Sequence, residues 1–213
     1  MSQLEPQLRA VLRARVKDYI QHNNKTVIFV THDQTEAVAL ADKIAVMENG
    51  DLKQLASPYE ISAKPSNVFV AYFIGEPPMN ILRAKINKSN NTLKFEILNE
   101  KNEKTFSINF GNEGIQKENL NKLANDQLIT LGIRPHKIFF NQKDSNFDGK
   151  ASSSSYHWLG DQVHIGIEIN GSSIIGVADR NFEPSSDVKL NFPLESINTV
   201  SYTHLTLPTT NSV

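Results

Sequence analysis

The hydrophobic positions of residues 1–74 follow first a helical and then a strand period. Apolar side chains recur at three- and four-residue spacing in the first segment, which predicts a helix with one apolar face. They are Leu8, Val11, Leu12, Val16, Tyr19 and Ile20. The continuous β-branched and aromatic run at residues 27–30 is typical of a strand covered on both faces. Helix and strand in succession predict an α/β fold for this part of the chain.

Three local signals place further elements in the same part. Asp33 can cap a second helix, and Glu36 three residues later completes a pair that resembles a capping box. Asn49-Gly50 predicts the turn of a hairpin formed by residues 43–55. Ser57-Pro58-Tyr59-Glu60 combines an N-cap, a proline at the first helical position and an acid at the third, which predicts a third helix.

From Ile81 onward the pattern changes to short strands separated by turn residues. The segments are 81–86, 92–98, 104–110, 128–133, 137–141, 163–169, 172–178 and 187–192. Such spacing predicts an all-β sandwich or barrel. We also expect one or two helical turns at residues 115–124 and a flexible connection at residues 152–155. The paired prolines of Glu76-Pro77-Pro78 disfavour helix and predict the hinge between the two halves.

Composition narrows the class of protein. Hydrophobic residues make up 39% of the 213, which is enough for a real core, and the net charge of −1 gives no broad field for nucleic acid or anionic lipid. The absence of cysteine excludes disulfides and thiolate metal sites. No apolar run reaches the length of a membrane span, and the N-terminus lacks the apolar core of a signal peptide. We expect a soluble cytoplasmic protein.

His32 is the strongest candidate for chemistry. A lone histidine is usually structural or simply exposed, but His32 follows directly on a predicted strand and precedes a predicted helix. Open α/β sheets bind ligands at the carboxyl ends of their strands, and a helix N-terminus favours phosphate. A neutral imidazole at that position can hydrogen-bond a phosphate oxygen or a water.

These residues carry a resemblance to a known family. The stretch VIFVTHDQTEAVALADKIAVMENGDLKQLASPYEISAKPSNVFVAYFIGEPPMNIL closely resembles the ATP-binding subunit of ABC transporters, and specifically the carbohydrate-import branch of the maltose and glycerol-3-phosphate type. The resemblance is contiguous from Met1 to about Leu82. It continues more weakly through the β-rich half, where Leu131-Gly132-Ile133-Arg134-Pro135 is similar to the commonest motif of the transport-associated OB-like (TOBE) domain. That family usually has an acid where this chain has His136.

The resemblance implies a fold class and three regions. Residues 1–76 correspond to an α/β fragment, the C-terminal part of a P-loop nucleotide-binding domain, and residues 77–198 to an all-β OB-like regulatory domain. Residues 199–213 are expected to be a non-native tail. VSYTHLTLPTT within this tail resembles a sequencing adapter translated in frame, although its Tyr, Thr and Val residues also suit a natural β-prone tail.

The resemblance also implies roles for particular residues. His32 corresponds to the switch histidine of the H-loop, which contacts the ATP γ-phosphate and positions the attacking water. Ser2, Gln3, Leu4 and Glu5 correspond to the D-loop at the dimer interface. The family prefers Asp where Glu5 stands, and Glu5 can equally be a first-turn acid that favours the helix dipole.

The other parts of such an ATP site are missing from the sequence. A phosphate loop of the form G-x-x-x-x-G-K-[ST] does not occur, and Gly149-Lys150-Ala151-Ser152 only imitates its end because position 144 is Asp. The family's L-S-G-G-Q signature is absent, and Leu159-Gly160-Asp161-Gln162 is no version of it. The family's Mg²⁺ ligand and catalytic glutamate precede the D-loop. We therefore expect Met1 to be an internal methionine of an incomplete gene and this chain alone to be an inactive fragment.

The full-length protein is expected to be an ATPase that uses Mg²⁺-ATP. It would act as a homodimer bound to integral membrane permeases on the cytoplasmic face of the cell membrane, energising uptake of a sugar or sugar phosphate, without nucleic acid as a partner. The alternative is a stand-alone OB-like module that binds small ligands and has no ATPase. Tyr156, His157 and Trp158 could then form a stacking platform, although a local turn or core patch explains them as well.

Overall fold

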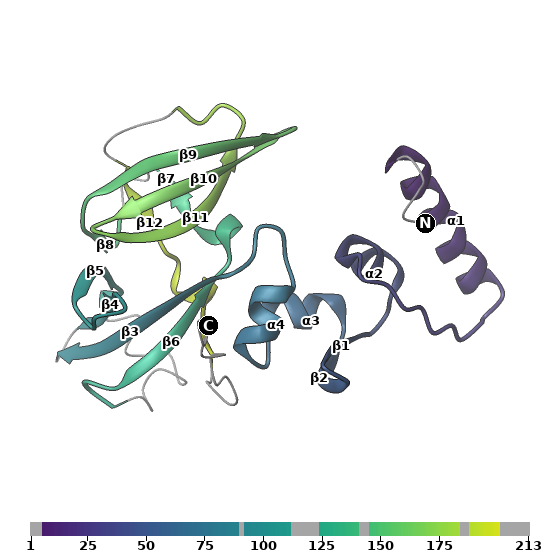
Figure 1. Cartoon of the computed structure of the whole chain (residues 1–213), viewed down its shortest axis with the longest axis horizontal. Coiled ribbons are helices and arrows are strands. Elements are labelled where there is room, and N and C mark those ends of the chain that lie inside the picture. The colour runs from purple at the N-terminus through teal and green to yellow at the C-terminus, as the bar shows by residue number, and fades with distance from the viewer. Residues whose placement is uncertain (1–5, 90–91, 112–123, 141–144, 184–187, 201–213) are drawn as a thin grey trace, which may run out of the picture. The chain divides into compact units, whose positions relative to one another are not determined.

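A computed structural model describes residues 6–89, 92–111, 124–140, 145–183 and 188–200 (Figure 1). The chain divides into two compact units, which we call the N-terminal unit, Met1–Ser66, and the C-terminal unit, Asn67–Val213. The division precedes the hinge predicted at Glu76-Pro77-Pro78, because a short helix before these prolines is hydrogen-bonded to the β-rich part of the chain. The Glu76–Pro77 peptide bond is cis.

In the N-terminal unit, residues 6–66 are described and form three helices and one hairpin. Helix α1 spans Pro6–His22, α2 spans Gln34–Leu40 and α3 spans Pro58–Ala63. Strands β1 (Ile44–Glu48) and β2 (Asp51–Ala56) pair in antiparallel fashion. The predicted turn is confirmed, since Asn49 and Gly50 have φ values of 52° and 88°. The capping box of Ser57 and Glu60 at the start of α3 is confirmed as well.

The strand predicted at residues 27–30 is wrong for this chain. These residues form no strand, and all four side chains are exposed, Ile28 to 92% and Val30 to 91%. A strand needs a hydrogen-bonded neighbour, and the described residues contain no strand that pairs with this segment. The only sheet described in the N-terminal unit is therefore the β1–β2 hairpin, and the parallel sheet of an α/β fold is not formed within the described residues.

The C-terminal unit is β-rich, as predicted. Its helix α4 spans Val68–Phe73. Its strands are β3 (Asn80–Ser89), β4 (Thr92–Leu98), β5 (Lys104–Asn109), β6 (Leu128–Ile133), β7 (Phe139–Phe140), β8 (Phe147–Asp148), β9 (Ala151–Leu159), β10 (Gln162–Ile169), β11 (Ser172–Asp179), β12 (Leu190–Asn191) and β13 (Ile197–Val200). Two 3₁₀ turns, η1 (Pro135–Lys137) and η2 (Leu194–Ser196), join them.

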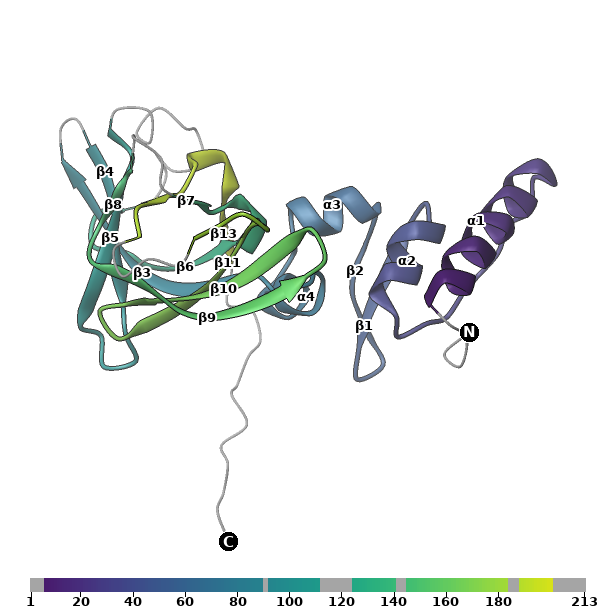
Figure 2. The ribbon, with the colours of Figure 1, turned by 90° about the horizontal axis from the view of Figure 1, so that it is seen from above.

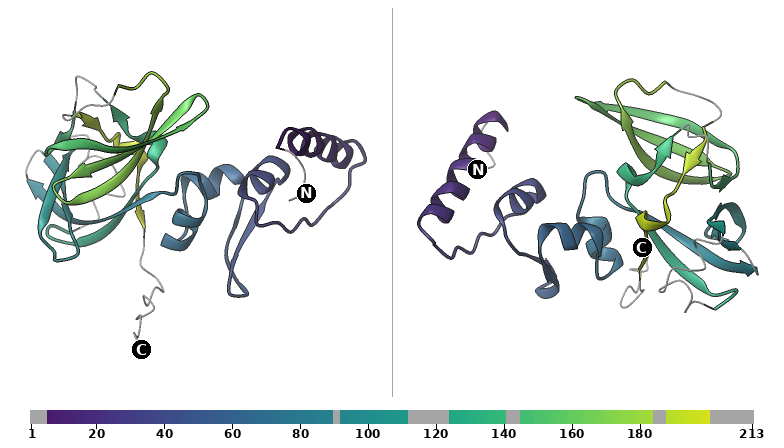
Figure 3. Two further views of the ribbon diagram at one scale, coloured as in Figure 1. Left: turned by 45° about the horizontal axis from the view of Figure 1, so that its top comes forward. Right: turned by 180° about the vertical axis from the view of Figure 1, so that it is seen from behind.

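The strands form two main sheets around one core. The first has the order β13-β6-β3-β4-β5-β8, the second has the order β11-β10-β9, and β12 pairs with β7. Figure 2 and Figure 3 show these strands curving around a shared interior. Along β4 and β10 every second residue is buried, so both sheets contribute alternating apolar side chains to the same core. Phe106 stacks on Phe192 and packs edge-on against Phe147 within this core.

The flexible connection predicted at residues 152–155 is wrong, because these residues belong to strand β9. Four serines in succession suggested a linker, yet β9 pairs with β10 along its length. Ser155 lies opposite Gly166, and a Cβ at Gly166 would collide with the Ser155 hydroxyl. The small partner therefore allows a close approach of the two strands that the local sequence did not indicate.

Two predictions fall partly or wholly outside the described residues. The helical turns expected at residues 115–124 lie almost entirely in the undescribed range 112–123. Of the tail expected at residues 199–213, Thr199 and Val200 lie in β13, where they pair with Leu131 and Thr130 of β6. The rest of the tail is outside the described residues.

Candidate functional site

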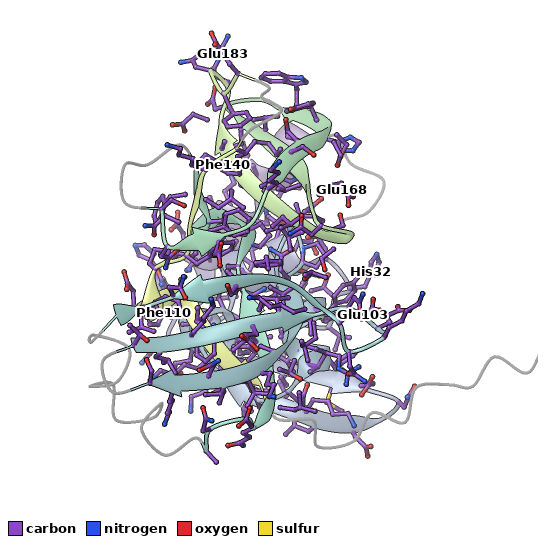
Figure 4. All side chains as sticks on the ribbon, turned by 90° about the vertical axis from the view of Figure 1, so that its left-hand side faces the viewer. His32, Glu103, Phe110, Phe140, Glu168 and Glu183 are labelled. Carbon is purple, nitrogen blue, oxygen red and sulfur yellow. The ribbon has the colours of Figure 1, made fainter. Side chains whose placement is uncertain are left out.

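His32 lies between the extended segment 27–30 and the first turn of α2, and its side chain is exposed (Figure 4). The neighbouring side chains hold the backbone of this joint in place. Thr31 Oγ1 donates to Glu36 Oε2 at 3.0 Å and accepts from the backbone N–H of Asp33 at 2.9 Å. These hydrogen bonds therefore fix the backbone on both sides of His32. We call Thr31-His32-Asp33 the joint.

Asp33 is the N-cap of α2, as predicted. Its Oδ1 accepts from the Glu36 backbone N–H at 3.0 Å. In a capping box the Glu36 carboxylate would accept a hydrogen bond from the backbone N–H of Asp33. Here it accepts from the Thr31 hydroxyl instead, so the pair differs from the predicted capping box. Glu36 is only 5% exposed, and this hydrogen bond gives its buried carboxylate a polar partner.

The hydrogen bonds within the Thr31-His32-Asp33 joint limit which of its groups can bind an anion. The Asp33 and Glu36 N–H groups already have acceptors within the chain, and Asp33 adds a carboxylate to the start of the helix. The backbone donors expected to help bind phosphate are therefore partly occupied. The exposed imidazole of His32 remains as the group at this joint suited to a phosphate oxygen or a water.

The proposed D-loop residues Ser2, Gln3, Leu4 and Glu5 lie outside the described residues. Their juxtaposition with His32 stays a prediction, as does the choice between the two roles of Glu5. The sequence that imitates a phosphate loop, residues 149–152, leads from β8 into strand β9. A phosphate loop leads from a strand into a helix, so this segment has the wrong context.

Arg134 is a structurally central residue whose role the sequence did not indicate. Arg134 is 5% exposed, and its guanidinium donates to the Ala71 carbonyl at 3.0 Å and to the Ile74 carbonyl. These carbonyls belong to the last turn and C-cap of α4, where a positive charge is favourable. Burial lowers the pKa of Arg134. The arginine of the Leu131–Pro135 motif therefore attaches α4 to the β-rich part of the unit.

Gly75 makes room for this contact. Its φ is +118°, and a Cβ there would lie 2.7 Å from Arg134 Nη1. A glycine shortly after a helix and before a proline pair was the available sequence signal for such a close approach.

Asn80, the first residue of β3, links the first main sheet to β11, an edge strand of the second. Its Nδ2 donates to the Ile175 carbonyl at 2.7 Å and to the Ile133 carbonyl at 3.2 Å, while its Oδ1 accepts from the Ile175 N–H at 2.8 Å. The Asn80 amide thereby pairs with the backbone C=O and N–H of Ile175, as a neighbouring strand would at the edge of β11. Asn80 thus has a structural role in this unit.

The three residues of the suggested stacking platform do not share one face. Adjacent residues of a strand point to opposite faces, so His157 lies opposite Tyr156 and Trp158 across β9. Tyr156 packs against the core, whereas Trp158 and His157 are exposed. A continuous platform of these three side chains is therefore excluded by the alternation of the strand.

Comparison with known proteins identifies relatives of one kind. The chain is 35% identical over 141 residues to the uncharacterized ABC transporter ATP-binding protein YurJ of Bacillus subtilis, covering 61% of this chain and 38% of YurJ. It is 34% identical over 138 residues to the xylose/arabinose import ATP-binding protein XacJ of Haloferax volcanii, covering 65% of this chain and 32% of XacJ.

A third relative is the uncharacterized ABC transporter ATP-binding protein YcjV of Escherichia coli, 35% identical over 156 residues. That match covers 71% of this chain, more than either unit contains, so it reaches into both units. The chain spans less than two fifths of the length of each of these relatives, 39% in the case of YcjV. No family model matches the chain.

The homologues of this chain are thus ABC transporter ATP-binding proteins, and one of them is named for sugar import. The helices that the structure describes include none that is both long and apolar enough to cross a membrane.

Proposed function

We propose that this chain is part of the ATP-binding subunit of an ABC importer of the carbohydrate-import type. The observation that carries the proposal is the similarity to ABC transporter ATP-binding proteins, which reaches into both units. The fastened Thr31-His32-Asp33 joint, with its exposed imidazole, agrees with the role that the resemblance implies for His32.

In this proposal His32 acts on the γ-phosphate of ATP. The imidazole hydrogen-bonds a phosphate oxygen or the attacking water, and it stabilises the charge that spreads over the phosphoryl oxygens during transfer. Thr31, Asp33 and Glu36 hold the backbone on either side, so that the imidazole is presented in one place. The contribution of His32 is positioning and electrostatic stabilisation.

The 213 residues contain no phosphate-loop motif, so residues outside this chain would hold most of the ATP and its Mg²⁺. Ser2, Gln3, Leu4 and Glu5 would form the D-loop and cross to a second copy of the subunit. The dimer would bind membrane permeases at the cytoplasmic face, and the transported solute would be a sugar or a sugar phosphate. Residues 77–198 would be the OB-like regulatory domain.

The first test uses the 213-residue chain itself. We expect neither tight ATP binding nor Mg²⁺-dependent hydrolysis, because the groups that cradle the phosphates are missing from its sequence. Turnover above the buffer background that disappears in His32→Ala would contradict this assignment of the missing parts.

The second test uses the native gene product in which this chain accompanies a phosphate loop. His32→Ala should leave ATP affinity and Tm nearly unchanged and lower turnover by about 10²- to 10³-fold, the usual cost of losing one polar contact made in the transition state. His22→Ala is the matched control, because His22 is an exposed histidine on α1 outside this joint. Unchanged turnover, or a loss accounted for by unfolding, would remove His32 from the mechanism.

The alternative of a stand-alone ligand-binding module is not favoured. A module confined to the β-rich part would leave unexplained that the similarity to these relatives reaches into the N-terminal unit.

A further inference from the structure

Two histidines face each other across strands β9 and β10. The register pairs His157 directly with His164. Val163 and Ile165, the neighbours of His164 along β10, are fully buried, so the alternation of the strand turns His164 to the outer face of the sheet. His157 is exposed on that same face, and His164 is half-buried.

The spacing of this pair suits a single metal ion. Directly opposed residues of an antiparallel pair have Cβ atoms about 4.5–5.5 Å apart. Imidazole nitrogens bind Zn²⁺ at about 2.0–2.1 Å, so two rings that lean together from this separation can share one ion without movement of the backbone. Imidazole is a preferred ligand of Zn²⁺, Cu²⁺ and Ni²⁺, whereas Mg²⁺ prefers oxygen ligands.

The surroundings of the pair leave an ion accessible to solvent. Strand β9 is the edge of its sheet, so the pair can be reached from outside. Asp179 pairs with Gln162 and therefore lies diagonally from His164 on the same outer face, where its carboxylate attracts a cation. The described residues contain no group of three or more potential ligands, so water would complete the coordination.

We propose that His157 and His164 form a surface chelate site for a divalent transition-metal ion such as Zn²⁺. The bound ion would fasten the edge strand β9 to β10 and would be independent of the Mg²⁺-ATP chemistry proposed for His32.

The test is a calorimetric titration of the 213-residue chain with Zn²⁺ at neutral pH. We expect one site in the wild type and at least a tenfold loss of affinity in both His157→Ala and His164→Ala, since even loss of a partner behind a metal ligand commonly costs about 10- to 100-fold. His22→Ala is the control and should bind as the wild type does. Circular dichroism of each variant confirms that it is folded.

A second measurement separates this site from other histidines. Zn²⁺ should raise the Tm of the wild type and of His22→Ala but not that of the two strand variants, because an ion that binds the folded chain stabilises it by mass action. Millimolar Mg²⁺ should not compete. No binding by the wild type, unchanged binding in either strand variant, or displacement of Zn²⁺ by Mg²⁺ would overturn the proposal.

Discussion

The two units of this chain differ in how far they cover their own apolar side chains. In the C-terminal unit both sheets turn alternate residues into one core, and Phe95, Phe106 and Phe192 are fully buried there. In the N-terminal unit the run 27–30 is exposed, and so are Met47, Leu52 and Leu55 on one face of the hairpin. The N-terminal unit nevertheless makes the caps and the turn that its sequence predicts. Local signals thus form without a complete core, whereas burial depends on which segments meet.

The sharpest test of this difference compares the loss of one large apolar side chain in each unit. Phe95→Ala should lower the free energy of unfolding by about 3–5 kcal/mol, because it opens a cavity in the closed core. Ile28→Ala should change it by less than about 0.5 kcal/mol, because Ile28 is already in water. Urea unfolding of the full chain measures both. Equal losses would show that residues 27–30 are buried in solution.

A second prediction concerns the attachment of α4 to the C-terminal unit. Arg134→Met should cost about 1–3 kcal/mol, since it leaves buried carbonyl oxygens of α4 without their donor. Limited proteolysis should then cleave near residues 67–75 faster than in the wild type. Arg83→Met, an exposed arginine on β3, is the control and should leave the digestion pattern unchanged. If both variants digest alike, Arg134 does not hold the helix.

The cap of α3 tests whether a helix cap in the N-terminal unit contributes its usual free energy to stability. Ser57→Ala removes the side chain that accepts from the Glu60 N–H and should destabilise α3 by about 1 kcal/mol. Amide hydrogen exchange within Pro58–Ala63 should speed up accordingly. Tyr59→Ala changes an exposed side chain of the same helix and should have little effect on that exchange. Similar acceleration in both variants would mean that the cap is not what holds the helix.

The smallest effect is expected from His136, where the related motif usually has an acid. Desolvation, followed by the charges of Lys137 and Arg134, lowers the pKa of His136. The unfolded chain therefore binds a proton at His136 before the folded chain does, so this group reduces stability as pH falls below about 6.5. His136→Gln should slightly flatten the dependence of Tm on pH between about pH 6.5 and 5. His22→Gln serves as the comparison variant in the same measurement. A steeper dependence in His136→Gln would contradict the direction of the shift.

Much of the fold followed from patterns within short windows. Asn49-Gly50 predicted the hairpin turn, Ser57 and Glu60 predicted the capping box, and most of the segments beyond residue 80 became strands. The errors have one physical cause. The run 27–30 reads as a buried strand and residues 152–155 read as a linker, yet in both cases the outcome depends on whether another segment of the chain pairs with them.

For the candidate site as well, the sequence predicted the local features and missed the contacts between separate residues. The sequence singled out His32 and the N-cap Asp33, because histidine at a joint and aspartate before a helix are local features. It did not indicate that Glu36 would bond Thr31, that Arg134 would hold α4, or that Asn80 would join two sheets. Each of these side chains can form hydrogen bonds with several kinds of partner, and the tertiary arrangement selects which partner it meets.

The sequence by itself therefore determined the caps, the turns, the alternation of the β-rich unit and the resemblance that points to an ABC transporter. Only the tertiary structure decided the strand order, the lack of strand pairing at residues 27–30 within the described residues and the meeting of His157 with His164. The physical reason is the range of the interactions. A cap or a turn is satisfied within a few residues, whereas a buried face or a cross-strand pair exists only when separate segments come together.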